Sequence, residues 1–118
     1  MHKKFGVRCN HRKALFLNLT KALIEHSRIE TTITKAKVLR PIIEKLVTKA
    51  KKCPNKELGV YRNIISELHQ DEAAATRLVD HVAKNYGNRP GGYTRIIRSR
   101  VRYDKTQMAF IEFTDYVK

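Results

Sequence analysis

Residues 89–102 of the chain read RPGGYTRIIRSRVR, and we expect the fold to be organised around this stretch. Gly91 and Gly92 have no Cβ atoms, so they allow a left-handed backbone and the close approach of a bulky surface. The residues that follow predict a strand, because an arginine stands at almost every second position after them. The stretch therefore predicts a glycine turn that leads into a cationic strand.

The alternation of the strand predicts two different faces. Arg98, Arg100 and Arg102 would share one face, since side chains two residues apart point the same way. The opposite face would carry Ile97, Ser99 and Val101. We expect the apolar face to be buried and the arginine face to meet a phosphate backbone.

The charge of the chain is large and unevenly placed. Its 118 residues contain 25 Lys and Arg against 11 Asp and Glu, a net charge of +14. Residues 1–24 have six basic side chains and no acid, and residues 84–105 have seven with only Asp104. Residues 25–83 are nearly balanced, with eleven basic and eight acidic side chains. The excess of positive charge favours a polyanionic partner. The length of the chain favours one domain spanning 1–118.

The sequence carries no pattern typical of catalysis or metal binding. Cys9 and Cys53 lie far apart without a second ligand pair, so they predict free thiols in a reducing compartment. The five histidines form no metal-ligand spacing, and no paired carboxylates or phosphate-binding glycine loop occur. The apolar runs are too short for a transmembrane segment. We therefore expect no enzymatic activity, cofactor, catalytic residue, metal, small-molecule substrate or membrane partner.

The first half of the chain predicts a basic arm at 1–10, then a helix to about His26 with Asn10 as its N-cap. Its buried stripe would be Leu15, Phe16, Leu19, Ala22 and Leu23. A short strand is expected at 29–33, followed by a helix at about 35–52 that Thr34 caps. Pro41 lies inside this pattern, so the helix either begins near Arg40 or bends there.

The second half predicts a turn at 53–55, a helix at about 56–69 and another helix capped by Asp71 and ended by Gly87. The stripe of this last helix would be Ala75, Leu78, Val79 and Val82. Strands at 94–103 and 107–114 would close an antiparallel hairpin. The predicted organisation is a mainly helical part at 11–86 and a glycine turn with a hairpin at 87–118. The class is α+β, with four helices packed on one small sheet.

Several blocks of residues, in order along nearly the whole chain, resemble the bacterial-type large-subunit ribosomal protein L-seventeen family. They include HRKALF at 11–16, RIETT at 28–32, GGYTR at 91–95 and MAFIE at 108–112. The resemblance implies an α+β fold with a three-stranded sheet. It also implies a structural protein that binds large-subunit ribosomal RNA near the nascent-chain exit tunnel, supports subunit assembly and contacts neighbouring ribosomal proteins.

Only about ten residues precede His11, whereas bacterial members usually have a longer basic arm. Short arms resemble organellar relatives, so the expected location is the large ribosomal subunit, in the bacterial cytoplasm or the mitochondrial matrix. A regulatory protein that binds RNA or DNA outside the ribosome is the alternative function.

Charge and resemblance together predict a set of RNA-binding residues. Tyr93 could stack on a base, although a tyrosine at the start of a strand more often packs in the core. The predicted residues are Lys3, Lys4, Arg8, His11, Arg12, Lys13, Lys35, Lys37, Arg89, Gly91, Gly92, Tyr93, Arg95, Arg98, Arg100 and Arg102.

Overall fold

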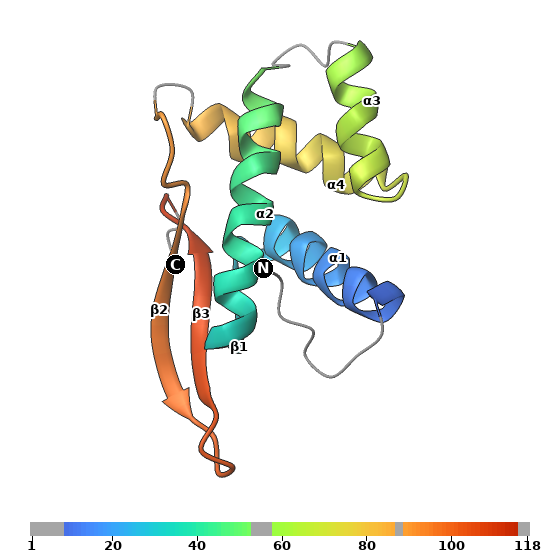
Figure 1. The fold of residues 1–118 in the computed structure, drawn as a ribbon. Coiled ribbons are helices and arrows are strands. Elements are labelled where there is room, and N and C mark those ends of the chain that lie inside the picture. Colours follow the sequence, from blue (N-terminus) through green and yellow to red (C-terminus); the bar gives the residue numbers. More distant parts are fainter. Residues whose placement is uncertain (1–8, 53–57, 87–88, 116–118) are drawn as a thin grey trace.

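The computed structural model describes residues 9–52, 58–86 and 89–115, in which four helices gather on one side of a three-stranded sheet (Figure 1). The elements are α1 (Cys9–His26), β1 (Arg28–Thr32), α2 (Ile33–Lys51), α3 (Leu58–Glu67), α4 (Glu72–Arg77), β2 (Thr94–Val101) and β3 (Gln107–Phe113). The α+β class is confirmed. The predicted arm, the turn at 53–55 and the Gly87 helix end lie outside the described residues, apart from residues 9 and 10.

The sheet has the order β1-β3-β2, with β3 antiparallel to both neighbours. The predicted hairpin of the last two strands is confirmed, and β1 is the strand that completes the sheet on the other side of β3. Thr31 of β1 lies opposite Ala109, which in turn lies opposite Arg98 of β2. The pairing therefore joins a strand from the first third of the chain to the C-terminal hairpin in one sheet.

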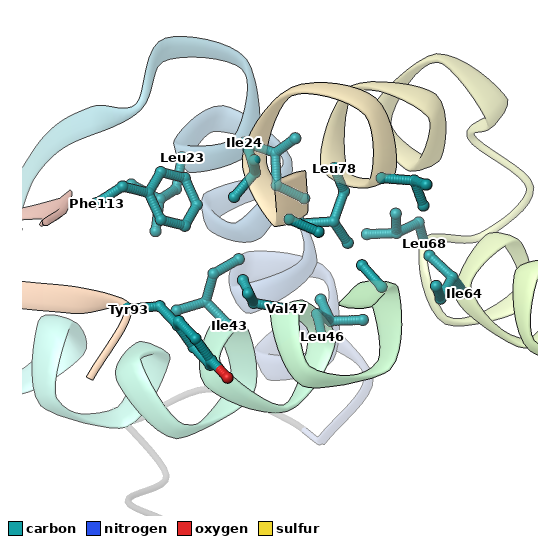
Figure 2. Close-up of a cluster of buried hydrophobic side chains, with 14 of the residues drawn as sticks. Leu23, Ile24, Ile43, Leu46, Val47, Ile64, Leu68, Leu78, Tyr93 and Phe113 are labelled. Atoms are coloured by element: carbon teal, nitrogen blue, oxygen red, sulfur yellow. The ribbon is translucent and has the colours of Figure 1, made fainter. Parts of the chain in front are cut away.

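The hydrophobic core lies between the sheet and the helices, and α2 runs through its centre (Figure 1). Ile111 and Phe113 point from β3 into this core, as Ile29 and Ile96 do from the outer strands. Figure 2 shows side chains of α2 in the same cluster as residues from α1, α3 and the sheet. Burying one Leu or Ile side chain completely stabilises a fold by about 1.5–3 kcal/mol. Because the side chains of α2 are buried in this shared cluster, α2 holds the sheet and the other helices together.

The first helix differs from the prediction at its start and in its buried face. It begins at Cys9, so Asn10 lies inside the first turn and is not the N-cap. Thr20 and Ile24 are buried in addition to Phe16 and Leu23. The Thr20 hydroxyl donates to the Phe16 carbonyl at 2.7 Å, which satisfies the hydroxyl inside the helix and allows its burial.

The second helix begins two residues earlier than predicted. Thr32 is its N-cap, because the Thr32 hydroxyl accepts a hydrogen bond from the Lys35 backbone N–H at 3.3 Å. The prediction of Thr34 as the cap is wrong, and Ile33 belongs to the helix rather than to the strand. α2 continues through Pro41, which is exposed, so water can solvate the carbonyl that proline leaves unpaired.

The fourth helix follows the prediction closely. The Asp71 carboxylate caps it by accepting from the Ala74 N–H at 3.0 Å. Its predicted stripe is buried, and the chain continues through a π-helical turn, Leu78–Val82, and a 3-10 turn, Ala83–Tyr86. This extension delivers the Tyr86 ring to the core, where its centroid lies 5.2 Å from that of Tyr93.

The start of β2 is attached to α2 by one carboxylate. Glu44 accepts hydrogen bonds from the backbone N–H of Tyr93 at 3.2 Å and of Thr94 at 2.9 Å. It also accepts from the Thr94 hydroxyl at 2.8 Å. The carboxylate thereby satisfies backbone donors at the point where the chain leaves the glycine turn and enters the sheet.

We predict that Glu44→Ala lowers the free energy of unfolding by about 2–3 kcal/mol, since it leaves part-buried donors without an acceptor. Glu44→Gln keeps one acceptor oxygen and should lose less. Chemical denaturation measures both values. Glu25→Ala is the matched control, because Glu25 is exposed at the end of α1 and should change stability by less than about 0.5 kcal/mol. Equal losses at both positions would contradict the attachment.

A second prediction concerns the cap of α4. The Ala74 N–H lowers the pKa of Asp71, and the nearby Lys21 ammonium adds to this effect. A carboxyl whose pKa is lower in the folded chain stabilises above its unfolded pKa of about 3.9 and loses this contribution as the pH falls through the folded value.

Asp71→Ala should cost about 1 kcal/mol at pH 7, whereas Asp71→Asn, which retains a capping oxygen, should cost much less. The stability gap between wild type and Asp71→Asn should narrow as denaturation is repeated at pH values falling towards 3. A gap that widens in acid would show that the charged form does not stabilise the cap.

Candidate RNA-binding surface

The arginine strand does not have the two faces that its alternation predicts. Between Arg98 and Val101 the pairing shifts, because β2 advances three residues while β3 advances two, from Ala109 to Gln107. The strand ends at Val101, so Arg102 already belongs to the turn. The expected single row of Arg98, Arg100 and Arg102 is therefore interrupted by an irregularity in the ladder.

The expected burial of the opposite face is also wrong. Ile97 is 42% exposed and Val101 is 59% exposed, and Ser99 is exposed as well. Ile96 lies opposite Ile111 and packs against the core. Its neighbour Ile97, opposite Phe110, therefore points to the face of the sheet away from the helices. The end of β2, beyond the shift in pairing, has no helix over it (Figure 1). Figure 1 shows this part of the hairpin, with its connecting turn, extending beyond all four helices at the bottom of the view.

Of the four arginines predicted in residues 95–102, three form ion pairs within the chain. Arg95 Nε lies 3.2 Å from a Glu112 oxygen, and Arg100 Nε lies 3.4 Å from a Glu30 oxygen. In the turn, Arg102 Nη2 lies 3.5 Å from an Asp104 oxygen. Arg98 is exposed and forms no ion pair within residues 9–52, 58–86 and 89–115. The arginines thus differ in how freely they can meet a phosphate.

Glu30 organises the end of the sheet that lies beyond the helices. The Ser99 hydroxyl donates to its Oε2 at 2.6 Å, and Arg100 approaches the same carboxylate from β2. The Ser99 hydrogen bond lowers the pKa of Glu30, and the Arg100 and Arg28 charges lower it further. Glu30 is therefore ionised at neutral pH and orients Arg100.

The pair of Arg95 and Glu112 differs because one partner is buried. Glu112 lies on the central strand with only 4% of its side chain exposed, while the Arg95 side chain is 49% exposed. A buried carboxylate requires a partner charge, so Arg95 is needed where it stands. Close by on the same face, the Arg28 guanidinium lies 3.7 Å from the centroid of the Phe110 ring. This cationic contact on β1 is absent from the predicted residues.

The residues on both sides of the glycine pair are bound to the end of α2, while the space next to Gly91 and Gly92 is open. Gly92 has a φ of 65°, which explains the glycine at this position. Tyr93 is only 2% exposed, so its ring packs in the core and is not available to stack on a base. Lys51 Nζ donates to the Tyr93 hydroxyl at 2.9 Å and also to the carbonyl of Arg89. Core packing of Tyr93 is confirmed, whereas its place among the RNA-binding residues stays a prediction.

A second group of cations lies on the helices. His11 and Lys13 are exposed and Arg12 is half-buried at the start of α1, while α2 carries half-buried Lys35 and exposed Lys37. A groove of about 450 Å³ separates part of α1 from α2 and has Phe16, Leu17, Val38, Ile42 and Leu46 among its lining residues. Its cationic lining residues are Arg12, Lys13, Lys45 and Lys49.

Sequence reasoning missed Lys45 and Lys49, because only the packing of α1 against α2 brings them next to Arg12. It also missed Tyr103 and Lys105 in the turn of the hairpin, both exposed, although they stand within the basic run. Lys3, Lys4 and Arg8 lie outside the described residues. In the described part of the chain, no group of three or more His, Cys, Asp or Glu could hold a metal ion. The helices found there are all too short or too polar to cross a membrane.

Comparison with known proteins agrees with the resemblance in the sequence. Residues 15–114 match the family described as Ribosomal protein L17. The chain is 50% identical over 116 residues to the large ribosomal subunit protein bL17 of Azorhizobium caulinodans, covering 98% of this chain and 81% of that protein. The proteins of the same name from Rhodopseudomonas palustris and Rickettsia bellii are 48% and 46% identical, over 98% and 96% of this chain and 83% and 78% of theirs. The chain therefore belongs to the ribosomal protein L17 family.

Proposed function

We propose that this protein is a structural constituent of the large ribosomal subunit that binds large-subunit ribosomal RNA near the nascent-chain exit tunnel and supports assembly. The observation that carries the proposal is the cationic surface of the hairpin, on which Arg98, Arg100 and Lys105 are exposed, in a chain with a net charge of +14. The names of the bacterial relatives support the ribosome as its setting and the bacterial cytoplasm as its location.

Phosphate binding begins at Arg98, which forms no ion pair with a carboxylate in the described part of the chain. Arg100 and Arg102 are held by Glu30 and Asp104, in pairs that are partly exposed to water. An exposed ion pair contributes only about 0–1 kcal/mol, so a phosphate group that offers two oxygens to the guanidinium can replace the carboxylate. The internal pairs hold these side chains extended before the RNA arrives.

Arg95 has a structural part in the same surface. Because its carboxylate partner Glu112 is buried, moving Arg95 to a phosphate would remove an ion pair from a buried carboxylate. We therefore assign Arg95 to positioning β2 on β3, and not to the exchange with RNA.

The cations around the groove between α1 and α2 form a second contact region, with Arg12 and Lys13 from the predicted set and Lys45 added by the structure. Contacts from such side chains to phosphates fix orientation and do not read bases. Recognition therefore depends on the shape of the RNA. Contacts with neighbouring ribosomal proteins also contribute to recognition. The alternative of a regulator outside the ribosome has no support from the relatives, and the family gives no reason to assign an enzymatic activity or a cofactor.

The first test measures binding to purified large-subunit ribosomal RNA as a function of salt. If about six phosphates are neutralised, affinity should fall about a thousandfold between 50 and 200 mM salt. Arg98→Ala should weaken binding and reduce the slope against log salt by about one. Arg62→Ala removes the same charge from α3, on the far side of the molecule from the hairpin, and should leave the slope nearly unchanged. A slope near zero in the wild type would falsify charge neutralisation.

A second test asks whether the protein stays with the subunit. Affinity-tagged protein expressed in a bacterium should sediment with the large subunit and remain there after a high-salt wash, because an assembled protein is held by many contacts at once. Free-standing regulators of similar charge should wash off under the same conditions. Recovery only in the unbound fractions would favour the regulatory alternative.

A further inference from the structure

The most exposed aromatic side chain in the described part of the chain is Tyr103, in the turn between β2 and β3. Its relative exposure is 100%. The exposed large hydrophobic residues described are Ile97, Val101 and Tyr103, and exposure rises from 42% through 59% to 100% along the hairpin. Apolar exposure is thus concentrated in one projecting element and increases towards its end, which points to a surface that a partner covers.

The turn that carries Tyr103 has a defined structure. The Arg102 N–H donates to the Thr106 carbonyl at 2.9 Å, and the Lys105 N–H donates to the Arg102 carbonyl at 2.8 Å. Lys105 takes a left-handed φ of 68°, and Asp104 accepts from the Thr106 N–H at 3.1 Å. Two hydrogen bonds from Thr106 lower the pKa of Asp104, so this carboxylate is ionised at neutral pH and keeps the turn closed. The backbone that carries the ring is therefore ordered before a partner binds, which lowers the entropy cost of binding.

The charges around the ring identify the kind of partner. Arg100, Arg102 and Lys105 stand on both sides of Tyr103 in the sequence. Arg100 is paired with Glu30 and Arg102 with Asp104, in pairs that are partly exposed to water. An aromatic face between cations is the arrangement that binds single-stranded nucleic acid, where bases stack on rings and cations meet the phosphates. Paired bases inside an A-form helix do not offer their faces, so the matching site is an unpaired base in a loop, bulge or junction.

We propose that Tyr103 stacks on an unpaired base of the ribosomal RNA and so fixes the hairpin at a specific position on the RNA. This inference rests on the proposed RNA-binding function and deepens it. Tyr103 takes the role that sequence reasoning offered to Tyr93, whose ring is buried. The arginines attract the phosphates of the RNA whatever its base sequence, and Tyr103 selects the place where a base is unpaired.

Affinity measurements separate stacking from charge. Tyr103→Leu keeps apolar bulk but removes the aromatic face, and should lower affinity for large-subunit ribosomal RNA by on the order of tenfold. The salt slope should stay unchanged, because no charge is altered. Tyr103→Phe keeps the ring and should bind within about twofold of the wild type. Circular dichroism should be the same for all three proteins, since the position is fully exposed.

A spectroscopic readout follows the ring itself. The chain contains no tryptophan, so Tyr103→Trp introduces a single fluorophore at the end of the hairpin. Its emission should be quenched when RNA is added, because stacking on a base quenches indole fluorescence. Asn63→Trp, at an exposed and uncharged position on α3, is the matched control and should not respond.

The outcomes are distinct for the two proposals. If the wild type shows no salt-dependent binding to the RNA, the proposed function fails. If the wild type binds but Tyr103→Leu binds equally well, or Tyr103→Trp is not quenched, the function stands and the stacking inference is wrong. If the tryptophan responds only in the assembled subunit and not to RNA alone, its partner is a neighbouring protein, and this also overturns the inference.

Discussion

The rest of the fold depends on the hydrogen bonds that the Glu44 carboxylate accepts from the start of β2. They tie α2, the helix at the centre of the core, to the residue pair Tyr93 and Thr94 where the sheet begins. Lys51, two helical turns further along α2, holds the Tyr93 hydroxyl from the other side. Together they set the direction in which the hairpin leaves the helices, and hence where its cations and Tyr103 are presented.

The hairpin shows why a net charge does not describe a binding surface. Arg95, Arg100 and Arg102 carry equal formal charges, but each has a carboxylate within the chain. The burial of Glu112 holds Arg95 in a structural role, whereas the partners of the other two are accessible to water and can be exchanged. The carboxylates also give these long side chains a preferred direction, which reduces the entropy that binding must remove. Internal acids therefore shape the cationic surface as well as neutralising it.

The sequence predicted those features of the helices well that depend only on neighbouring residues. Asp71 caps α4 as expected, and the stripe of that helix is buried, because capping and helical periodicity depend on residues within one or two turns. The cap of α2 was misplaced by two residues. Thr32 and Thr34 offer the same hydroxyl, and only the end of β1 pairing with β3 decides where the strand stops. Burial of Ile97 was wrong because alternation predicts two faces but not which of them meets the helices, and in the structure Ile96 is the residue that packs against the core.

The sequence by itself determined the class of the fold, the cationic character and the family, since these follow from composition, periodicity and residue blocks that need no knowledge of distant contacts. Only the tertiary structure decided which cations are available. The pairing of β1 with β3 brings Glu30 to Arg100, 70 residues away in the chain. The burial of Tyr93 leaves Tyr103 as the most exposed aromatic ring in the described part of the chain. These outcomes depend on which residues become neighbours across the sheet and core, and that information is non-local.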